Sequence, residues 1–198
     1  MSITVAAYYD ALLAEGQDPV LDPPVLKSYM DGWDGEVFLE KMHIAPTFSV
    51  LEVGVGTGRL AVRVAPLCGR FLGVDIAPKT VERARTHLAS FENAAVLCAD
   101  FLTYPFSEQF DIVYSSLTWM HIEQKAAAFQ KVAELLAPDG RFLLSIDKST
   151  DREIVFGERR IAVFPDDFKE TERLILFSGL SLIETLETER AYLFMAKK

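Results

Sequence analysis

The chain has 198 residues, half of them apolar, which suits a single domain with a substantial core. Its formal net charge of −9 and its lack of a Lys/Arg cluster argue against a nucleic-acid partner, because clustered cations provide that affinity. Charged residues interrupt every apolar stretch, so we expect no membrane-spanning segment. Only two cysteines are present and residues 1–10 do not resemble a secretory signal, which favours a cytoplasmic location.

Residues 1–47 differ from the rest and are expected to form a helical segment. Tyr8–Glu15 and Gly35–His43 have helical patterns, and three prolines interrupt residues 17–24 between them. From residue 48 onward, short apolar runs of strand length alternate with amphipathic stretches. The expected strands are Phe48–Val53, Arg70–Asp75, Ala94–Ala99, Phe110–Ser115 and Arg141–Ile146, and the expected helices are Gly58–Pro66, Pro78–Ser90 and Glu123–Ala137, the last closed by a Pro138-Asp139-Gly140 turn.

The alternation predicts an α/β fold, because strands that are apolar on both faces are typical of a parallel sheet covered by helices. The end of the chain departs from the alternation. After a helix at Asp166–Ser178, the strand-like runs Leu180–Glu187 and Arg190–Ala196 follow each other closely. So short a connection predicts an antiparallel pair. A small inserted hairpin is expected within Glu153–Phe164.

A glycine-rich turn, Glu52-Val53-Gly54-Val55-Gly56-Thr57-Gly58-Arg59, follows the first strand. Glycines allow a ligand to lie against the backbone at a helix N-terminus. A dinucleotide site would need a glycine where Arg59 stands. The G-x-G-x-G spacing with an acid ahead of it resembles the first motif of class I S-adenosylmethionine-dependent methyltransferases. The resemblance implies S-adenosylmethionine as cofactor, and an acidic residue suits its cationic end. A structural turn and a nicotinamide site remain as alternatives. The predicted contacts in this loop are Glu52, Gly54, Gly56, Thr57 and Gly58.

Later strand ends carry further matches to the same family. Asp75 ends the second strand about 20 residues after the first glycine, where a carboxylate can accept the ribose hydroxyls, and Ile76 would pack on the adenine. The resemblance implies that Asp100 receives the adenine amino group and that Phe101 flanks the ring. A helix-capping role for Asp100 stays open. Ser115 and Ser116 leave the fourth strand where cofactor and substrate would meet.

These motifs lie in the expected order over residues 50–146. The resemblance implies a seven-stranded Rossmann-like sheet, mostly parallel, with an antiparallel C-terminal hairpin and helices on both faces. Residues 1–198 would then form one methyltransferase domain, with a lid at 1–47 and the core at 48–198. The family's acidic residue, two prolines and an aromatic that mark nucleic-acid amino-methylation are absent after the fourth strand, and so are the acids of a magnesium site.

The sequence therefore predicts methyl transfer to a small-molecule acceptor by in-line displacement, without a metal. A relative that binds the cofactor but performs another reaction, or only regulates, is the alternative. His121 is the best single candidate for a general base, although the sequence favours a role in capping or orienting the helix that begins at Glu123. Tyr9 and Trp33 of the lid and Asp147 after the fifth strand are candidates for substrate contact. Neither the acceptor nor the oligomeric state can be read from the sequence.

Overall fold

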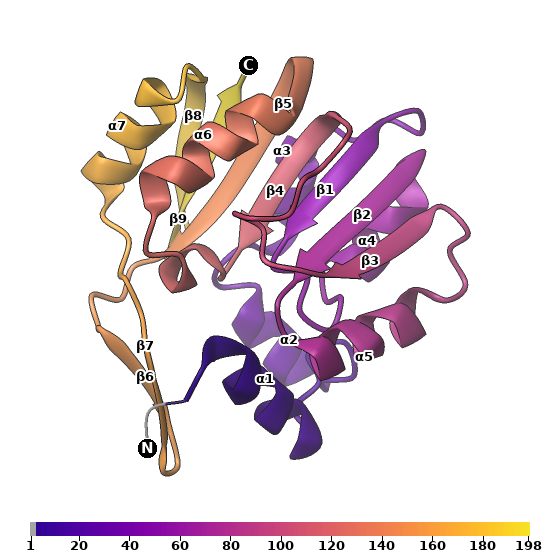
Figure 1. Cartoon of the computed structure of the whole chain (residues 1–198), viewed down its shortest axis with the longest axis vertical. Coiled ribbons are helices and arrows are strands. Elements are labelled where there is room, and N and C mark those ends of the chain that lie inside the picture. The colour runs from indigo at the N-terminus through magenta and orange to yellow at the C-terminus, as the bar shows by residue number, and fades with distance from the viewer. Residues whose placement is uncertain (1–2) are drawn as a thin grey trace.

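The computed structural model describes residues 3–198 as a central sheet with helices on both faces (Figure 1). The strand order is β3-β2-β1-β4-β5-β9-β8. All neighbouring pairs are parallel except β5–β9 and β8–β9. This confirms the predicted seven-stranded, mostly parallel sheet with an antiparallel hairpin at its end. The strands are β1 Ser49–Val53, β2 Arg70–Asp75, β3 Ala94–Cys98, β4 Phe110–Ser116, β5 Leu136–Asp147, β8 Ser181–Glu187 and β9 Ala191–Lys197.

The helices divide between the two faces of the sheet and the edge at which the parallel strands end. One apolar cluster packs α6 and α7 on the sheet, and a second packs α3, α4 and α5 on the opposite face. Within residues 3–198, no helix is long and apolar enough to cross a bilayer. The helices are α1 Val5–Ala14, α2 Pro24–Met30, α3 Gly35–Met42, α4 Ala61–Val64, α5 Pro78–Leu88, α6 Lys125–Leu135 and α7 Phe168–Phe177, with short 3-10 turns η1 Ala65–Leu67 and η2 Trp119–His121.

The predicted inserted hairpin is present as β6 Glu153–Phe156 and β7 Arg159–Ala162, which pair in antiparallel fashion. It projects from the end of β5 and lies beside α1 at the bottom of Figure 1. Arg159 forms an ion pair with Glu15 at the end of that helix, with Nη2 and Oε2 2.5 Å apart. The hairpin therefore supports the N-terminal segment from outside.

Three local predictions were wrong. Helix α2 was not predicted, because the prolines at positions 19, 23 and 24 were interpreted as an interruption, although Pro24 occupies the first turn, where proline favours a helix. The helix after the glycine loop is shorter than predicted and passes into η1. The Pro138-Asp139-Gly140 turn lies within β5 as a bulge, marked by a register shift opposite Phe110–Ile112 and by a φ of 64° at Asp139.

Helix α1 is fixed across the first turn of α5. The N-terminal residue Ala77 offers α5 no side-chain cap. Instead, Asp10 of α1 accepts hydrogen bonds from the backbone N–H groups of Lys79 and Thr80, at 2.9 and 3.0 Å. A carboxylate at a helix N-terminus is stabilised by the free N–H groups and the helix dipole. This contact holds α1 over the carboxyl ends of the strands, where Figure 1 shows it.

The packing of the core predicts that substitutions at two phenylalanines change the stability of the protein by very different amounts. Phe129 is 1% exposed and packs against Trp119 and Phe142, whereas Phe177 is 77% exposed. We expect Phe129→Ala to lower the free energy of unfolding by about 3–5 kcal/mol through lost burial and a cavity. Phe177→Ala should change it by less than about 0.5 kcal/mol. Urea unfolding of both variants checks this, and equal losses would contradict the described packing.

Candidate active site

A cavity of about 480 Å³ opens at the carboxyl ends of β1, β2, β4 and β5, beneath α1. Parallel strands bring the residues that follow them to one edge of a sheet, and ligands bind there in open α/β folds. The cavity brings together nearly all of the predicted site residues. Its lining includes Tyr9, Trp33, Glu52, Gly54, Gly56, Thr57, Asp75, Ile76, Asp100, Phe101, Ser116, His121 and Asp147.

One wall of the cavity is formed by main-chain atoms of the glycine loop. A Cβ on Gly56 would meet no atom within 4 Å, so the space beside this residue is free for a ligand. Gly54 has a φ of 79°, and a Cβ there would collide with Thr118. Gly58 has a φ of 99° and begins the turn into α4 but is not among the lining residues. Thr57 is 6% exposed, and its hydroxyl lacks a hydrogen-bond partner within residues 3–198. An unpaired buried hydroxyl beside an open backbone fits a polar ligand.

Glu52 presents a buried acid to this wall. The Tyr114 hydroxyl donates a hydrogen bond to its Oε2 at 2.7 Å. Burial raises the pKa of Glu52 from 4.5 to about 8, against the lowering effects of Tyr114 and Arg59. A cation placed beside Glu52 would favour the ionised carboxylate. The position therefore fits the cationic end of S-adenosylmethionine.

The residues after β2 and β3 form the second wall. Asp75 accepts hydrogen bonds from the backbone N–H of Gly56 and of Ala77, both at 3.0 Å, and burial raises its pKa. Ile76 lies 42% exposed at the cavity, which leaves an apolar surface for a ring. Asp100 lines the cavity too, but its Oδ1 also caps the backbone N–H of Leu102 at 2.7 Å.

Phe101 and the two serines at the end of β4 differ in how far they are buried and in whether they line the cavity. Phe101 is 6% exposed and belongs to the core while also lining the cavity. Ser115 is fully buried and is not among the lining residues, because its hydroxyl points back to the carbonyl of Val53 at 2.8 Å. A direct cofactor contact by the Ser115 side chain does not fit this geometry. Ser116 lines the cavity and donates its hydroxyl hydrogen bond to Asp34.

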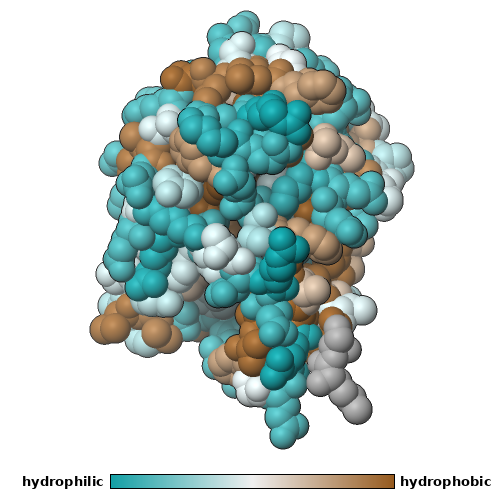
Figure 2. All heavy atoms as spheres, turned by 90° about the vertical axis from the view of Figure 1, so that its left-hand side faces the viewer, coloured by the Kyte–Doolittle hydropathy of each residue, from teal (hydrophilic) through white to brown (hydrophobic). Residues whose placement is uncertain are grey.

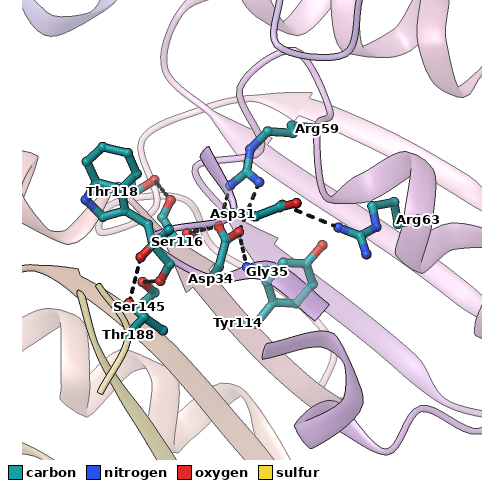
Figure 3. A network of polar contacts seen from close by, with 12 residues as sticks. Asp31, Asp34, Gly35, Arg59, Arg63, Tyr114, Ser116, Thr118, Ser145 and Thr188 are labelled. Carbon is teal, nitrogen blue, oxygen red and sulfur yellow. Dashed lines mark hydrogen bonds and ion pairs between the residues drawn. The ribbon is translucent and has the colours of Figure 1, made fainter. Parts of the chain in front are cut away.

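Asp34 is the centre of the polar network in Figure 3, and it was not identified from the sequence. Its side chain is fully buried and accepts from the backbone N–H of Gly35 at 2.7 Å and from the Ser116 hydroxyl at 2.6 Å. The guanidinium of Arg59 forms an ion pair with the same carboxylate. A buried carboxylate requires such partners. The Asp-Gly pair just ahead of a helical pattern is the sequence signal that could have indicated this capping position.

Trp33 attaches the N-terminal segment to the end of β5. Its indole Nε1 donates to Oδ2 of Asp147 at 3.0 Å, and the backbone N–H of Ser149 donates to Oδ1 at 2.7 Å. The Ser145 hydroxyl donates to the Trp33 carbonyl at 2.7 Å, and the guanidinium of Arg190 lies over the indole at 5.0 Å. These contacts bring two of the predicted substrate residues, Trp33 and Asp147, into direct contact.

Tyr9 and His121 meet across the cavity. The Tyr9 hydroxyl lies 2.8 Å from Nε2 of His121, and their rings are edge to face. Burial, with a smaller contribution from Lys125, lowers the pKa of His121 to about 4, and burial raises the pKa of Tyr9. Nδ1 of His121 is buried and has no partner in the described part of the chain. A pKa this low makes His121 a weak base, and its Nε2 is already engaged by Tyr9, so the geometry suits holding Tyr9 in place better than accepting a proton.

The sequence around this site matches a known protein family. Residues 50–140 match the family described as "Methyltransferase domain". This segment, which runs from β1 into β5, belongs to a methyltransferase domain. The match confirms the predicted family and enzyme class, and with them S-adenosylmethionine as the cofactor of the family.

Individual relatives of the methyltransferase domain differ in what they methylate. Nodulation protein S of Bradyrhizobium diazoefficiens is 28% identical over 132 residues, which are 63% of this chain and 63% of that protein. This chain thus aligns with slightly less than two thirds of the length of that relative. A tRNA1(Val) (adenine(37)-N6)-methyltransferase of a Flavobacteriaceae bacterium is 27% identical over 81% of this chain and 83% of its own length.

The fold of the methyltransferase domain is shared with solved structures. N-methyltransferase NodS from Bradyrhizobium japonicum WM9, in complex with S-adenosyl-L-homocysteine, superimposes with a TM-score of 0.70. The comparison covers 96% of this chain and 97% of NodS, at 20% identity.

Among residues 3–198, no group of three His, Cys, Asp or Glu side chains is arranged to hold a metal ion.

Glu52 predicts how the stability of the domain depends on pH. Because its pKa is about 8 when folded and near 4.5 when unfolded, the native state binds more protons between these values. Its contribution is therefore favourable at low pH and is lost as pH rises from about 4.5 to about 8. Glu52→Gln should remove this loss, whereas the exposed Glu92→Gln should retain it. Urea unfolding at pH 5 and pH 8.5 gives the change in the free energy of unfolding between the two pH values for each variant. The same change in both variants would contradict the burial described for Glu52.

Proposed function

We propose that the chain transfers a methyl group from S-adenosylmethionine to a small-molecule acceptor. The observation that carries this proposal is the single 480 Å³ cavity, which joins the glycine loop and Asp75 to the acceptor candidates Trp33, His121 and Asp147. A cavity of this size accommodates a cofactor and a small partner side by side.

In this proposal, one wall binds the cofactor. Gly56 allows it to approach the backbone, and Thr57 supplies an unpaired hydroxyl. Asp75 retains acceptor capacity on both oxygens for the ribose hydroxyls, since each carries one backbone hydrogen bond. Glu52 faces the cationic amino-acid end and becomes ionised when that charge arrives.

The opposite wall holds the acceptor. The bound donor supplies a methyl group on sulfonium, which is already an activated leaving group. The protein must then align the acceptor and exclude water. Tyr9 from α1 and Trp33 from the segment before α3 close the cavity, and their bonds to His121 and Asp147 keep them there. His121 acts as a positioning residue for Tyr9.

The properties of the chain support a small acceptor over a nucleic acid. Its relatives include proteins named as N-methyltransferases and one named for a tRNA substrate, so the names do not choose between the classes. The net charge of −9 opposes a polyanion. In addition, α1 borders the cavity and the β6–β7 hairpin lies against α1, which restricts the room for a large substrate.

Calorimetric titration with S-adenosylmethionine and S-adenosylhomocysteine tests the cofactor wall. We expect Gly56→Val to abolish binding, because the added side chain fills the space that the ligand occupies. Gly179→Val is the matched control, since Gly179 also has a positive φ and open surroundings but lies in the turn before β8. It carries the same backbone strain and should bind normally. Full affinity in Gly56→Val would overturn this placement of the cofactor.

Asp75→Ala measures the ribose contact in the same titration. Loss of a charge-assisted hydrogen bond should weaken binding by about 1–3 kcal/mol without abolishing it. An unchanged affinity would mean that Asp75 only braces the glycine loop through the Gly56 N–H. Strong cofactor binding with no methyl transfer to any of a broad panel of small molecules would contradict the proposed reaction.

A further inference from the structure

A second cavity, of about 240 Å³, adjoins the first on the side away from the glycine loop. Met120 and Asp147 line both cavities, so the acceptor end of the first leads directly into the second. The outer wall of the second cavity is formed by the β6–β7 hairpin and the segment that leads to α7. The proposed function leaves this second cavity without a role.

The second cavity is negatively charged. Four carboxylates line it and no Lys or Arg does, and its remaining described lining is largely apolar. From outside the lining, Lys125 pairs with Asp166 and Arg160 pairs with Glu153, so two of the four charges are compensated. In the first cavity the only Lys or Arg of the lining is Arg59, which is engaged by Asp34. Hydrophilic residues also cover most of the molecular face that carries the hairpin and α7 (Figure 2). The carboxylates are Asp147, Asp151, Glu153 and Asp166, and the apolar residues are Met120, Ile154, Val155, Val163 and Pro165.

Asp166 gives this cavity a buried acceptor that is incompletely bonded. Its side chain is only 1% exposed. Lys125 Nζ lies 2.6 Å from Oδ1, yet that oxygen has no well-directed hydrogen bond within the described residues. Desolvation raises the pKa of Asp166, as expected for a buried carboxyl. A carboxylate can accept about four hydrogen bonds, so Asp166 retains capacity for a donor in the cavity.

We propose that the methyl acceptor is a small aliphatic amine, whose nitrogen binds between Asp147 and Asp166 and whose body extends along the apolar residues of the hairpin. The inference rests on the proposed methyl transfer and names its substrate class. Carboxylates attract an ammonium group and repel the phosphate or carboxylate of an anionic acceptor. The apolar residues of the hairpin match a hydrocarbon chain, which gains affinity by leaving water.

The position of Asp147 connects recognition to reaction. It lies at the end of β5 and is oriented by Trp33 and Ser149, so its carboxylate is fixed where the two cavities meet. The bound ammonium loses one proton to solvent through the exposed side near Asp151 and Glu153. The free nitrogen lone pair then forms the N–C bond to the methyl group, while the C–S bond breaks and its electron pair stays on sulfur. A methylated ammonium and neutral S-adenosylhomocysteine result, so charge and atoms balance.

Three probes of equal length test the proposal: n-hexylamine, n-hexanol and hexanoate, titrated into the protein saturated with S-adenosylhomocysteine. We expect hexylamine to bind at least about 10-fold more tightly than hexanol, and hexanoate not to bind. Asp147→Asn should weaken hexylamine binding about 10- to 100-fold, because it removes a charge-assisted hydrogen bond but keeps the shape of the side chain. Asp166→Asn should also weaken it, and the exposed Asp151→Asn should do so less.

The control is Glu158→Gln, which removes the same charge from the turn of the same hairpin but lies outside the lining of the cavity. Its hexylamine affinity should equal that of the wild type. Should Asp166→Asn fail to fold, Asp147→Asn and Asp151→Asn decide the outcome. Hexanol or hexanoate binding as well as hexylamine, or equal losses in Glu158→Gln and Asp147→Asn, would overturn the amine assignment.

Methyl transfer to the three probes separates this inference from the function on which it rests. Methylation of hexylamine alone supports both. Binding of S-adenosylmethionine with methylation of hydroxyl compounds but not of amines would overturn the amine assignment and leave methyl transfer intact. Failure to bind S-adenosylmethionine at all would overturn the proposed function itself.

Discussion

The arrangement of the site depends on one buried carboxylate. Asp34 is fully buried, and a charge removed from water must be compensated by nearby donors. Two of its partners belong to the core, namely Arg59 after the glycine loop and Ser116 at the end of β4, whereas Asp34 belongs to the N-terminal segment. This pairing therefore fixes the segment against the cofactor loop. Trp33, the preceding residue, is thereby held within reach of Asp147.

The electrostatics of the cavity follow from a shortage of cations. Glu52 and Asp75 are both desolvated, and both have raised pKa values. Arg59 lies close enough to lower the pKa of Glu52, but its hydrogen bonds go to Asp34. Ionising several buried carboxylates close together costs more free energy than ionising one, because each charge is desolvated and repels the others. A cationic ligand bound beside them lowers this cost. At the other end of the site the same argument applies to Asp147, which forms no ion pair within residues 3–198, whereas Lys125 pairs with Asp166 and Arg160 pairs with Glu153.

Local sequence predicted the sheet and two of the three helices of the N-terminal segment, but it did not predict helix α2 or the contacts that this segment makes. The strands after residue 48 could be located because parallel strands buried on both faces form continuous apolar runs, and the glycine spacing is read within one short segment. Helix α2 escaped prediction because the prolines at positions 23 and 24 were interpreted as a break in the chain, whereas they precede and open a helix of seven residues. The bulge in β5 was interpreted as a turn, since the residues Pro138-Asp139-Gly140 favour both structures. The contact between Tyr9 and His121 joins positions 112 residues apart, and no local pattern encodes it.

The two walls of the cavity differ in how the sequence specifies them. The cofactor wall consists of short segments at the ends of neighbouring strands, each positioned by backbone hydrogen bonds of the sheet and each recognisable by itself. The proposed acceptor wall is assembled from the N-terminal segment, the end of β5 and the inserted hairpin, which meet only through tertiary contacts. Changes in the hairpin or the N-terminal segment can therefore alter the acceptor without disturbing the sheet that positions the methyl donor. This separation explains, in physical terms, why a common core serves relatives with different acceptors and why the acceptor must be inferred from charge and shape instead of from the glycine loop.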